Sequence, residues 1–355
     1  WTGTFTPTAD TEDDTNVCAL ATSYTDANGN SGPAANTANY AVETLAPSVN
    51  SITMSDTALK TGDTSTLTIV FTEAVAGFAS DDDVTCPSGS LAAMTSGDSI
   101  TWAGTFTPSA DTDADSNTCS VGTDYTDTAG NTGTAGTSAN YDVDTVAPTV
   151  SSIALSDTDV ITGDTPTLTI QFSSAVSGFA SADDVTCPNG ALSTMTSSDS
   201  ITWTGTFTPS SSTSDDSNTC DVGTGYTDDA GNTGVAGQSA NYKVDTIAPS
   251  VNSISFNDAA MKSGDTPTLT IVFSEAVAGF ASADDVSCPN GALANMASGD
   301  SITWTGTFTP TADTEDDTNV CTVATSYTDT LGNSGGGATS ANYAVETLKP
   351  TATIA

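Results

Sequence analysis

The chain has 355 residues, of which 44 are acidic and four are lysine, with no arginine and no histidine, so its formal net charge is −40. A field of that sign repels nucleic acid and anionic membrane surfaces, so both are excluded as partners. The absence of histidine and arginine excludes most catalytic mechanisms, so we expect that the chain is not an enzyme. No apolar run approaches the roughly 18 residues that would insert this segment into a bilayer.

The sequence repeats with a constant step of 101 residues, marked by Trp1, Trp102, Trp203 and Trp304. Tyrosines and cysteines keep the same step, and no insertion separates the copies. A unit of this size can bury a core of its own. The predicted divisions are half a repeat at 1–45, complete repeats at 46–146, 147–247 and 248–348, and the start of another at 349–355.

Residues 46–146 illustrate the elements expected in each repeat. Ala46-Pro47 gives a rigid, extended entry, and Gly62-Asp63 is turn chemistry. Leu67, Ile69 and Phe71 alternate with Thr66, Thr68 and Val70, which predicts a half-buried strand. The full set of expected strands covers 48–54, 66–71, 83–86, 91–94, 100–108, 118–121 and 138–143. No segment has a helical period of useful length.

About seven short antiparallel strands in a unit of this length predict an all-β fold, with tandem immunoglobulin-like β-sandwiches. Two sheets would bury alternate residues in one core. Trp102, Tyr141 and Val143 are expected to face that core.

Each complete repeat carries two cysteines 33 residues apart. The pairs are Cys86 with Cys119, Cys187 with Cys220, and Cys288 with Cys321. A recurring pair predicts one disulfide per repeat and an oxidising compartment, and each cysteine occupies an inward position on strands expected to be neighbours in one sheet. The alternative is two buried free thiols acting as small core residues.

Four motifs in the first complete repeat resemble a known repeat type. They are Thr-Leu-Thr-Ile-Val-Phe-Thr-Glu-Ala-Val-Ala-Gly-Phe at 66–78, Trp-Ala-Gly-Thr-Phe-Thr-Pro at 102–108, Tyr-Thr-Asp-Thr-Ala-Gly-Asn at 125–131, and Ser-Ala-Asn-Tyr-Asp-Val-Asp-Thr-Val-Ala-Pro at 138–148. Together they resemble the bacterial immunoglobulin-like tandem repeats of giant, calcium-dependent surface and biofilm adhesins. The resemblance covers every repeat, and it implies an extracellular or cell-surface stalk.

The same resemblance implies calcium at the junctions between repeats, where carboxylate, amide and main-chain oxygens suit a hard cation. Three recurring sets of residues are the candidate ligands. The acids before each Thr-x-x-Pro are Glu43, Asp144, Asp245 and Glu346. The Asp-x-x-Gly-Asn loops contribute Asp26 with Asn30, Asp127 with Asn131, Asp228 with Asn232, and Asp329 with Asn333. The acids after the first strand are Asp56, Asp157 and Asp258.

Two further acidic clusters recur, at 111–115 and at Asp82-Asp83 in the first complete repeat. We interpret both as solvated loops that keep a secreted rod soluble, with calcium binding as the alternative.

The function we expect is the repeat stalk of a long adhesin, stiffened by disulfides and calcium. One alternative is a subunit of an assembled extracellular filament, sheath or appendage, and another is a carbohydrate-binding module. The corresponding partners are other copies of the repeat, other surface or filament proteins, or glycans. A filament predicts exposed apolar residues at the repeat step; Phe78, Phe179 and Phe280 are candidates, although each is expected to cap its own core.

Overall fold

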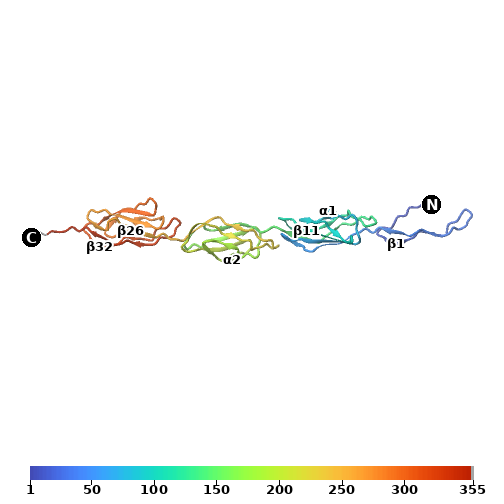
Figure 1. Cartoon of the computed structure of the whole chain (residues 1–355), viewed down its shortest axis with the longest axis horizontal. Helices are drawn as coiled ribbons and strands as arrows, with labels where there is room; N and C mark the ends of the chain where they lie inside the picture. Colours follow the sequence, from blue (N-terminus) through green and yellow to red (C-terminus); the bar gives the residue numbers. More distant parts are fainter. Residues whose placement is uncertain (353–355) are drawn as a thin grey trace. The chain divides into compact units, whose positions relative to one another are not determined.

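A computed structural model describes residues 1–352 as an all-β chain of repeated sandwiches (Figure 1). The chain forms two compact units. Unit 1 contains residues 1–148 together with 227–234, and unit 2 contains 149–226 together with the described residues from 235 onward. No helix among the described residues is long and apolar enough to cross a membrane.

Unit 1 begins with the half repeat, whose strands form two antiparallel pairs. One pair is β1 (Glu12–Asn16) with β4 (Tyr40–Glu43), and the other is β2 (Ala19–Leu20) with β3 (Ala35–Asn36). Most side chains of these strands are exposed, because half a repeat supplies only part of a sandwich core.

The complete repeat of unit 1 is built around a large sheet. Its members are β5 (Val49–Met54), β7 (Ser65–Phe71), β9 (Gly89–Leu91), β10 (Thr95–Ser96) and β11 (Thr101–Pro108). In β7 the predicted alternation is confirmed, since Leu67, Ile69 and Phe71 are all buried. A bulge between Val49 and Ser51 shifts the register against β7, which lets Val49 and Ile52 pack against the same core despite their odd spacing.

Two smaller sheets complete this sandwich. The acidic sheet contains β6 (Ala58–Leu59), β12 (Asp113–Asn117) and β15 (Tyr141–Asp144), with β6 parallel to β15. The cysteine sheet contains β8 (Val84–Thr85), β13 (Ser120–Val121) and β14 (Gly136–Thr137). Because β8 pairs with β13, Cys86 and Cys119 lie opposite each other at the strand ends. They form a disulfide, as the sequence predicts.

Unit 2 contains two further sandwiches with the same three sheets. In the second repeat the large sheet contains β16 (Val150–Leu155), β18 (Thr167–Phe172), β20 (Gly190–Leu192) and β21 (Thr202–Pro209). The acidic sheet of this repeat contains β17 (Asp159–Ile161), β22 (Ser214–Asn218) and β25 (Tyr242–Asp245). Its cysteine sheet contains β19 (Val185–Thr186), β23 (Asp221–Val222) and β24 (Gly237–Gln238). In the third repeat the large sheet contains β26 (Val251–Phe256), β28 (Thr268–Phe273), β30 (Gly291–Leu293) and β31 (Thr303–Pro310). The acidic sheet of this repeat contains β27 (Ala260–Lys262), β32 (Glu315–Asn319) and β35 (Tyr343–Glu346). Its cysteine sheet contains β29 (Val286–Ser287), β33 (Thr322–Val323) and β34 (Ala338–Thr339).

The acidic cluster at Asp82-Asp83 is not a solvated loop. It lies in a one-turn helix, α1 (Ser80–Asp83), and Asp83 is only 6% exposed. The carboxylate of Asp83 accepts a hydrogen bond from the main-chain N–H of Ala79, which satisfies a donor at the start of the turn. The same turn recurs as α2 (Ser181–Asp184) and α3 (Ser282–Asp285). The cluster at 111–115 is likewise not a loop alone, because it leads into β12.

Aromatic side chains form the centre of each core. Phe106, Tyr125 and Tyr141 are fully buried in the first complete repeat, and burial of each contributes roughly 1.5–3 kcal/mol. Trp102 is half-buried at the edge of this core and packs edge-on against Phe78. Phe78 itself is 7% exposed, so it caps its own core as expected. The exposed apolar residues that keep the repeat step are instead Leu45, Val146, Ile247 and Leu348.

Candidate metal centre and the repeat junction

The Asp-x-x-Gly-Asn loop folds around its own aspartate. In the third repeat, Oδ1 of Asp329 accepts hydrogen bonds from the main-chain N–H groups of Leu331, Gly332 and Asn333 at 2.6–3.0 Å. Gly332 adopts φ +114°, a backbone conformation that other residues rarely adopt, so the motif requires glycine there. The sequence of the loop therefore fixes the position of the carboxylate.

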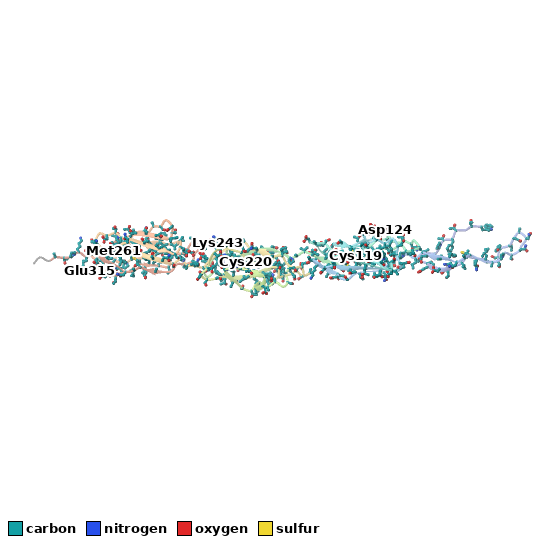
Figure 2. The ribbon with its side chains drawn as sticks, in the orientation of Figure 1. Cys119, Asp124, Cys220, Lys243, Met261 and Glu315 are labelled. Carbon is teal, nitrogen blue, oxygen red and sulfur yellow. A yellow bond between two sulfur atoms is a disulfide. The ribbon has the colours of Figure 1, made fainter. Side chains whose placement is uncertain are left out.

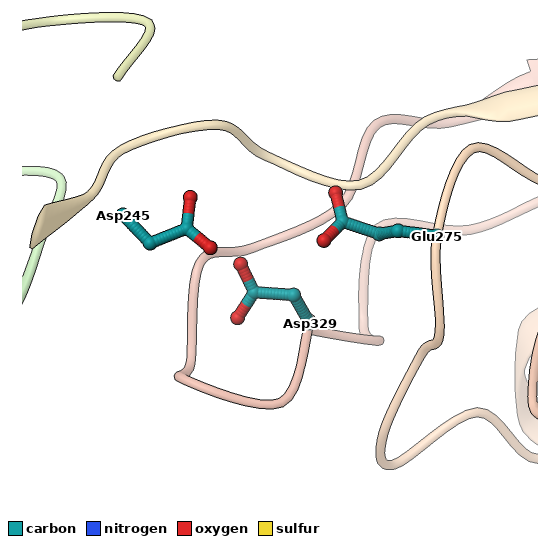
Figure 3. Close-up of side chains that lie close together, drawn as sticks. All are labelled: Asp245, Glu275 and Asp329. Carbon is teal, nitrogen blue, oxygen red and sulfur yellow. The ribbon is translucent and has the colours of Figure 1, made fainter. Parts of the chain in front are cut away.

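Asp329 lies beside two other carboxylates from different elements (Figure 3). Asp245 ends β25, and Glu275 follows β28. One oxygen from each of the three side chains lies within 4.8 Å of the others. Asp329 is 2% exposed and the other two are half-buried, so part of the charge is shielded from water. We call this group the junction carboxylates, because it contains residues from the second and third repeats.

Burial and mutual repulsion perturb the group. Burial raises the pKa of Glu275 above its ordinary value of 4.5, and the nearby charges of Asp245 and Asp329 raise it further. In unit 1, burial also raises the pKa of Glu73, with further increases from Asp127 and Glu43. A carboxyl group with a raised pKa is one whose negative charge lacks a compensating partner.

The donor set suits a hard cation. All three side chains offer oxygen, the ligand atom that calcium prefers, whereas zinc sites are built from nitrogen, sulfur and oxygen. No lysine neutralises the group: among residues 1–352 the structure shows one ion pair, between Lys243 and Asp216. Main-chain carbonyls and water would complete the six to eight ligands that calcium takes.

Carboxylates also face each other across the β1–β4 pair of the half repeat and across the acidic sheets of the first and third complete repeats. The paired residues are Glu12 with Glu43, Asp113 with Asp144, and Glu315 with Glu346. Like charges directly opposite each other on neighbouring strands destabilise a sheet. Burial and the charges of Asp228, Asp113 and Asp115 together raise the pKa of Asp144. Acids therefore accumulate at the ends of the repeats beyond the three grouped residues.

The predicted ligand Glu43 belongs to this arrangement, since Asn131 donates to its main-chain oxygen at 3.3 Å. Asp127 is 3% exposed; burial raises its pKa, but hydrogen bonds from Asn131, Gly130 and Ala129 outweigh this and hold it below the ordinary range. In the half repeat, Asp26 bonds in the same way to Asn30 and is exposed. Glu346 is exposed at the end of β35.

The asparagines of the loops make hydrogen bonds within the loop and to the preceding repeat. The side-chain amide of Asn333 donates to Asp329 and to the main-chain oxygen of Asp245, while its oxygen accepts from the main-chain N–H of Thr162. Asn232 makes the same three types of contact in unit 1. Each of these two side chains donates two hydrogen bonds and accepts one.

The structure does not bring the acids after the first strand to the junction carboxylates. Asp56, Asp157 and Asp258 are exposed, and each accepts a hydrogen bond from the main-chain N–H two residues further on. Such bonds stabilise local turns. The residue that sequence reasoning missed is Glu275. Its signal was present in the Phe-Ser/Thr-Glu-Ala-Val segment, which contains Glu73 in the first complete repeat and Glu275 in the third, but has Ser174 in the second.

The disulfide prediction is confirmed in all three complete repeats (Figure 2 labels Cys119 and Cys220). Cys119, Cys220 and Cys321 are fully buried. Cys18, in the half repeat, is a free and exposed thiol.

The chain has several weak likenesses to solved structures. The Escherichia coli adhesin FdeC is 13% identical, with 83% of this chain and 96% of that one covered and a TM-score of 0.35. Invasin, a bacterial integrin-binding protein, is 13% identical, with 77% and 56% covered and a TM-score of 0.29. The surface-layer protein SbsC is 14% identical, with 87% and 55% covered and a TM-score of 0.20. No curated protein matches.

The family described as bacterial Ig-like domain matches residues 43–143, 144–244 and 245–345. The three matches are contiguous and each covers one step of the repeat. They account for most of the sequence and agree with the all-β sandwiches of the structure. This chain therefore belongs to the family of bacterial Ig-like domains.

Proposed function

We propose that the chain is a structural segment of a bacterial extracellular adhesin, in which its repeats act as a stalk that carries adhesive modules. The observation that carries this proposal is the contiguity of the three family matches, with no residue left between them. The three cores are also built from equivalent residues. Interchangeable units without inserted loops suit a spacer better than a set of diversified binding sites.

Two features support an extracellular, load-bearing role. Each complete repeat contains a disulfide, and such bonds persist in oxidising compartments. The net charge of −40 keeps an exposed chain soluble and away from anionic surfaces.

Calcium at the repeat junctions is the second part of the proposal. The junction carboxylates Asp245, Glu275 and Asp329 are the best-formed donor group, and bound calcium would remove their repulsion. A ligand that binds only the folded state stabilises it by mass action. We expect the chain to melt at a higher temperature in millimolar calcium than in excess EDTA.

The matched variant is Glu275→Ser, which copies Ser174 of the second repeat and preserves the rest of the chain. Calorimetry of the full chain should show a smaller calcium-dependent rise in melting temperature for this variant. Isothermal titration should show fewer or weaker sites. Identical melting curves for the native chain in calcium and in EDTA would remove calcium from the proposal.

A second candidate function, lateral assembly into a filament, is favoured by the distribution of charge. No strand of the large sheets carries a charged residue in any of the three complete repeats. The acidic sheets carry most strand charges, as in Asp-Ala-Asp-Ser-Asn of β12. Two chains of the same negative charge would meet with least repulsion through their large sheets.

Electron microscopy and sedimentation at increasing protein concentration test this candidate. The probe is the exposed threonine of the long central strand, which recurs as Thr105, Thr206 and Thr307. If the large sheets pack together, replacing all three with aspartate should dissociate filaments or bundles. A chain that stays monomeric at high concentration and moderate salt favours the stalk alone.

A further inference from the structure

Asn333 is a buried amide that makes three hydrogen bonds. It is 3% exposed, and it belongs to the Asp-x-x-Gly-Asn loop of the third repeat. Its oxygen accepts from Thr162 N–H at 3.0 Å, and its amide donates to the main-chain oxygen of Asp245 at 2.9 Å and to Asp329 at 2.7 Å. Thr162 and Asp245 lie in the second repeat, so one side chain joins two consecutive repeats.

The same arrangement is present in unit 1. Asn232 is 2% exposed; its oxygen accepts from Thr61 N–H at 2.9 Å, and its amide donates to the oxygen of Asp144 and to Asp228, both at 3.0 Å. Asn131, which follows only the half repeat, is half-buried and keeps the bond to Glu43. The asparagine therefore bonds to both the turn and the last strand of the preceding repeat only where that repeat is complete.

The surface that receives the asparagine is assembled within the preceding repeat. The hydroxyl of Thr162 donates to the main-chain oxygen of Thr246, and that of Thr61 donates to Thr145. These bonds tie the turn after the second strand to the end of the last strand. As a result, one main-chain donor and one main-chain acceptor are held at the spacing that a side-chain amide requires.

Recognition uses main-chain groups of the preceding repeat, so it tolerates sequence variation. The residue next to the recognised turn is Lys60 in the first complete repeat and Ile161 in the second. Their side chains approach the loop glycines Gly231 and Gly332, yet the amide contacts are equivalent in both places. Any repeat with this turn can present the same donor and acceptor.

We propose that the asparagine of the Asp-x-x-Gly-Asn loop is the docking residue of the repeat. It binds the end of a preceding copy, and it holds consecutive repeats together whether or not a cation is bound. The two bonds to the preceding repeat involve neutral main-chain groups, and the third, to the Asp329 carboxylate, holds Asp329 beside Asp245. Calcium would act instead on the charges of those carboxylates. The inference therefore goes beyond the calcium proposal and survives without it.

The chemistry requires an amide. Aspartate at position 333 cannot donate to the oxygen of Asp245, and it adds a fourth carboxylate beside the junction carboxylates. Alanine leaves the Thr162 N–H and the Asp245 oxygen without their partner, and a buried unpaired group is costly. Both Asn333→Asp and Asn333→Ala should open the contact.

Hydrogen exchange of the full chain, resolved to single amides, measures how often the hydrogen bond between the Thr162 N–H and the Asn333 side chain opens. We expect this amide to be protected both in calcium and in excess EDTA. Asn333→Asp and Asn333→Ala should speed its exchange at least about tenfold, the equivalent of one lost buried hydrogen bond. Amides of the core strand β18 (Thr167–Phe172) should stay protected, which shows that the repeat remains folded.

Asn342→Asp is the matched control. Asn342 is exposed, and its amide donates to Asp317 in its own repeat, so this change adds the same charge without touching the junction. It should leave Thr162 exchange unaltered. Unaltered exchange in Asn333→Ala, or loss of Thr162 protection in the native chain on adding EDTA, would overturn the proposal. Failure of calcium to raise the melting temperature, with Thr162 still protected, would refute only the calcium proposal.

Discussion

At the scale of single residues, Glu275 shows how the junction stores electrostatic strain. Burial raises its pKa above 4.5, followed by the charges of Asp245 and Asp329. The folded chain consequently keeps this proton at pH values where the unfolded chain has released it. The protonated form contributes stability that is fully present below the ordinary glutamate pKa and is lost as the pH rises through the raised value.

This decrease in stability with rising pH gives a prediction for the metal-free chain. In EDTA, part of the free energy of unfolding should fall as the pH rises from the ordinary glutamate pKa toward neutrality, because Glu275 loses its proton over that rise. Glu275→Gln removes that contribution. Thermal unfolding should therefore place the variant above the native chain near pH 7, with the two melting temperatures converging as the pH falls to the ordinary glutamate pKa. Parallel curves for the two proteins across this range would contradict the assignment.

The junction was only partly predictable from sequence. The Asp-x-x-Gly-Asn spacing identified Asp329 and Asn333, because a local turn fixes both. It did not show that the asparagine would bond to a turn 171 residues earlier. Nor did the sequence bring Glu275 to Asp245, since these residues meet only through the packing of the third repeat after the second. The position of Asp258 after the first strand predicts a place at the junction, but its carboxylate bonds to the main-chain N–H of Ala260 in its own turn.

At the scale of elements, strands with an alternating apolar pattern were predictable and polar strands were not. β7 alternates over its whole length and lies where expected. β12 has the sequence Asp-Ala-Asp-Ser-Asn, which offers no apolar alternation, and it is held by pairing with β15. The buried amide of Asn117 donates to the main-chain oxygens of Ala114 and Tyr141, which fixes the bulge between the two strands. Tertiary context therefore decides this strand.

The cysteine sheet depends on its covalent bond more than the other sheets do. β29 and β33 are two residues each, so few main-chain hydrogen bonds hold them. Closing a loop of 33 residues by a disulfide contributes roughly 3–4 kcal/mol. Replacing Cys288 and Cys321 together with alanine should lower the free energy of unfolding of the third repeat by about this amount.

Chemical denaturation of the native chain and of this double variant measures the difference. The first and second repeats, which keep their disulfides, are the internal reference. Reduction of the native chain should destabilise all three complete repeats in a similar way. A loss well below 1 kcal/mol in the double variant would show that the bond contributes little beyond the packing of its neighbours.

At the scale of the whole molecule, charge is the dominant constraint. The sequence contains 44 acidic residues and four lysines, and the described residues form a single ion pair. Folding brings these acids closer together than they are in the unfolded chain, so self-repulsion opposes the compact state. Repulsion between exposed charges is screened over roughly 10 Å at 0.1 M salt and roughly 3 Å at 1 M.

Sodium chloride should therefore stabilise the chain in EDTA, with the melting temperature rising steadily up to about 1 M as screening improves. Calcium should add a further rise in melting temperature because it acts at the junction carboxylates. This rise should appear at millimolar concentration, far below the level at which screening by ionic strength matters. Magnesium at equal concentration is the control for divalent screening, and its effect should be smaller because magnesium dehydrates reluctantly. Equal shifts in melting temperature with magnesium and calcium would mean that divalent ions screen the acids non-specifically and do not bind at a defined site. A melting temperature insensitive to sodium chloride would mean that the acids are too far apart in the folded chain to repel one another.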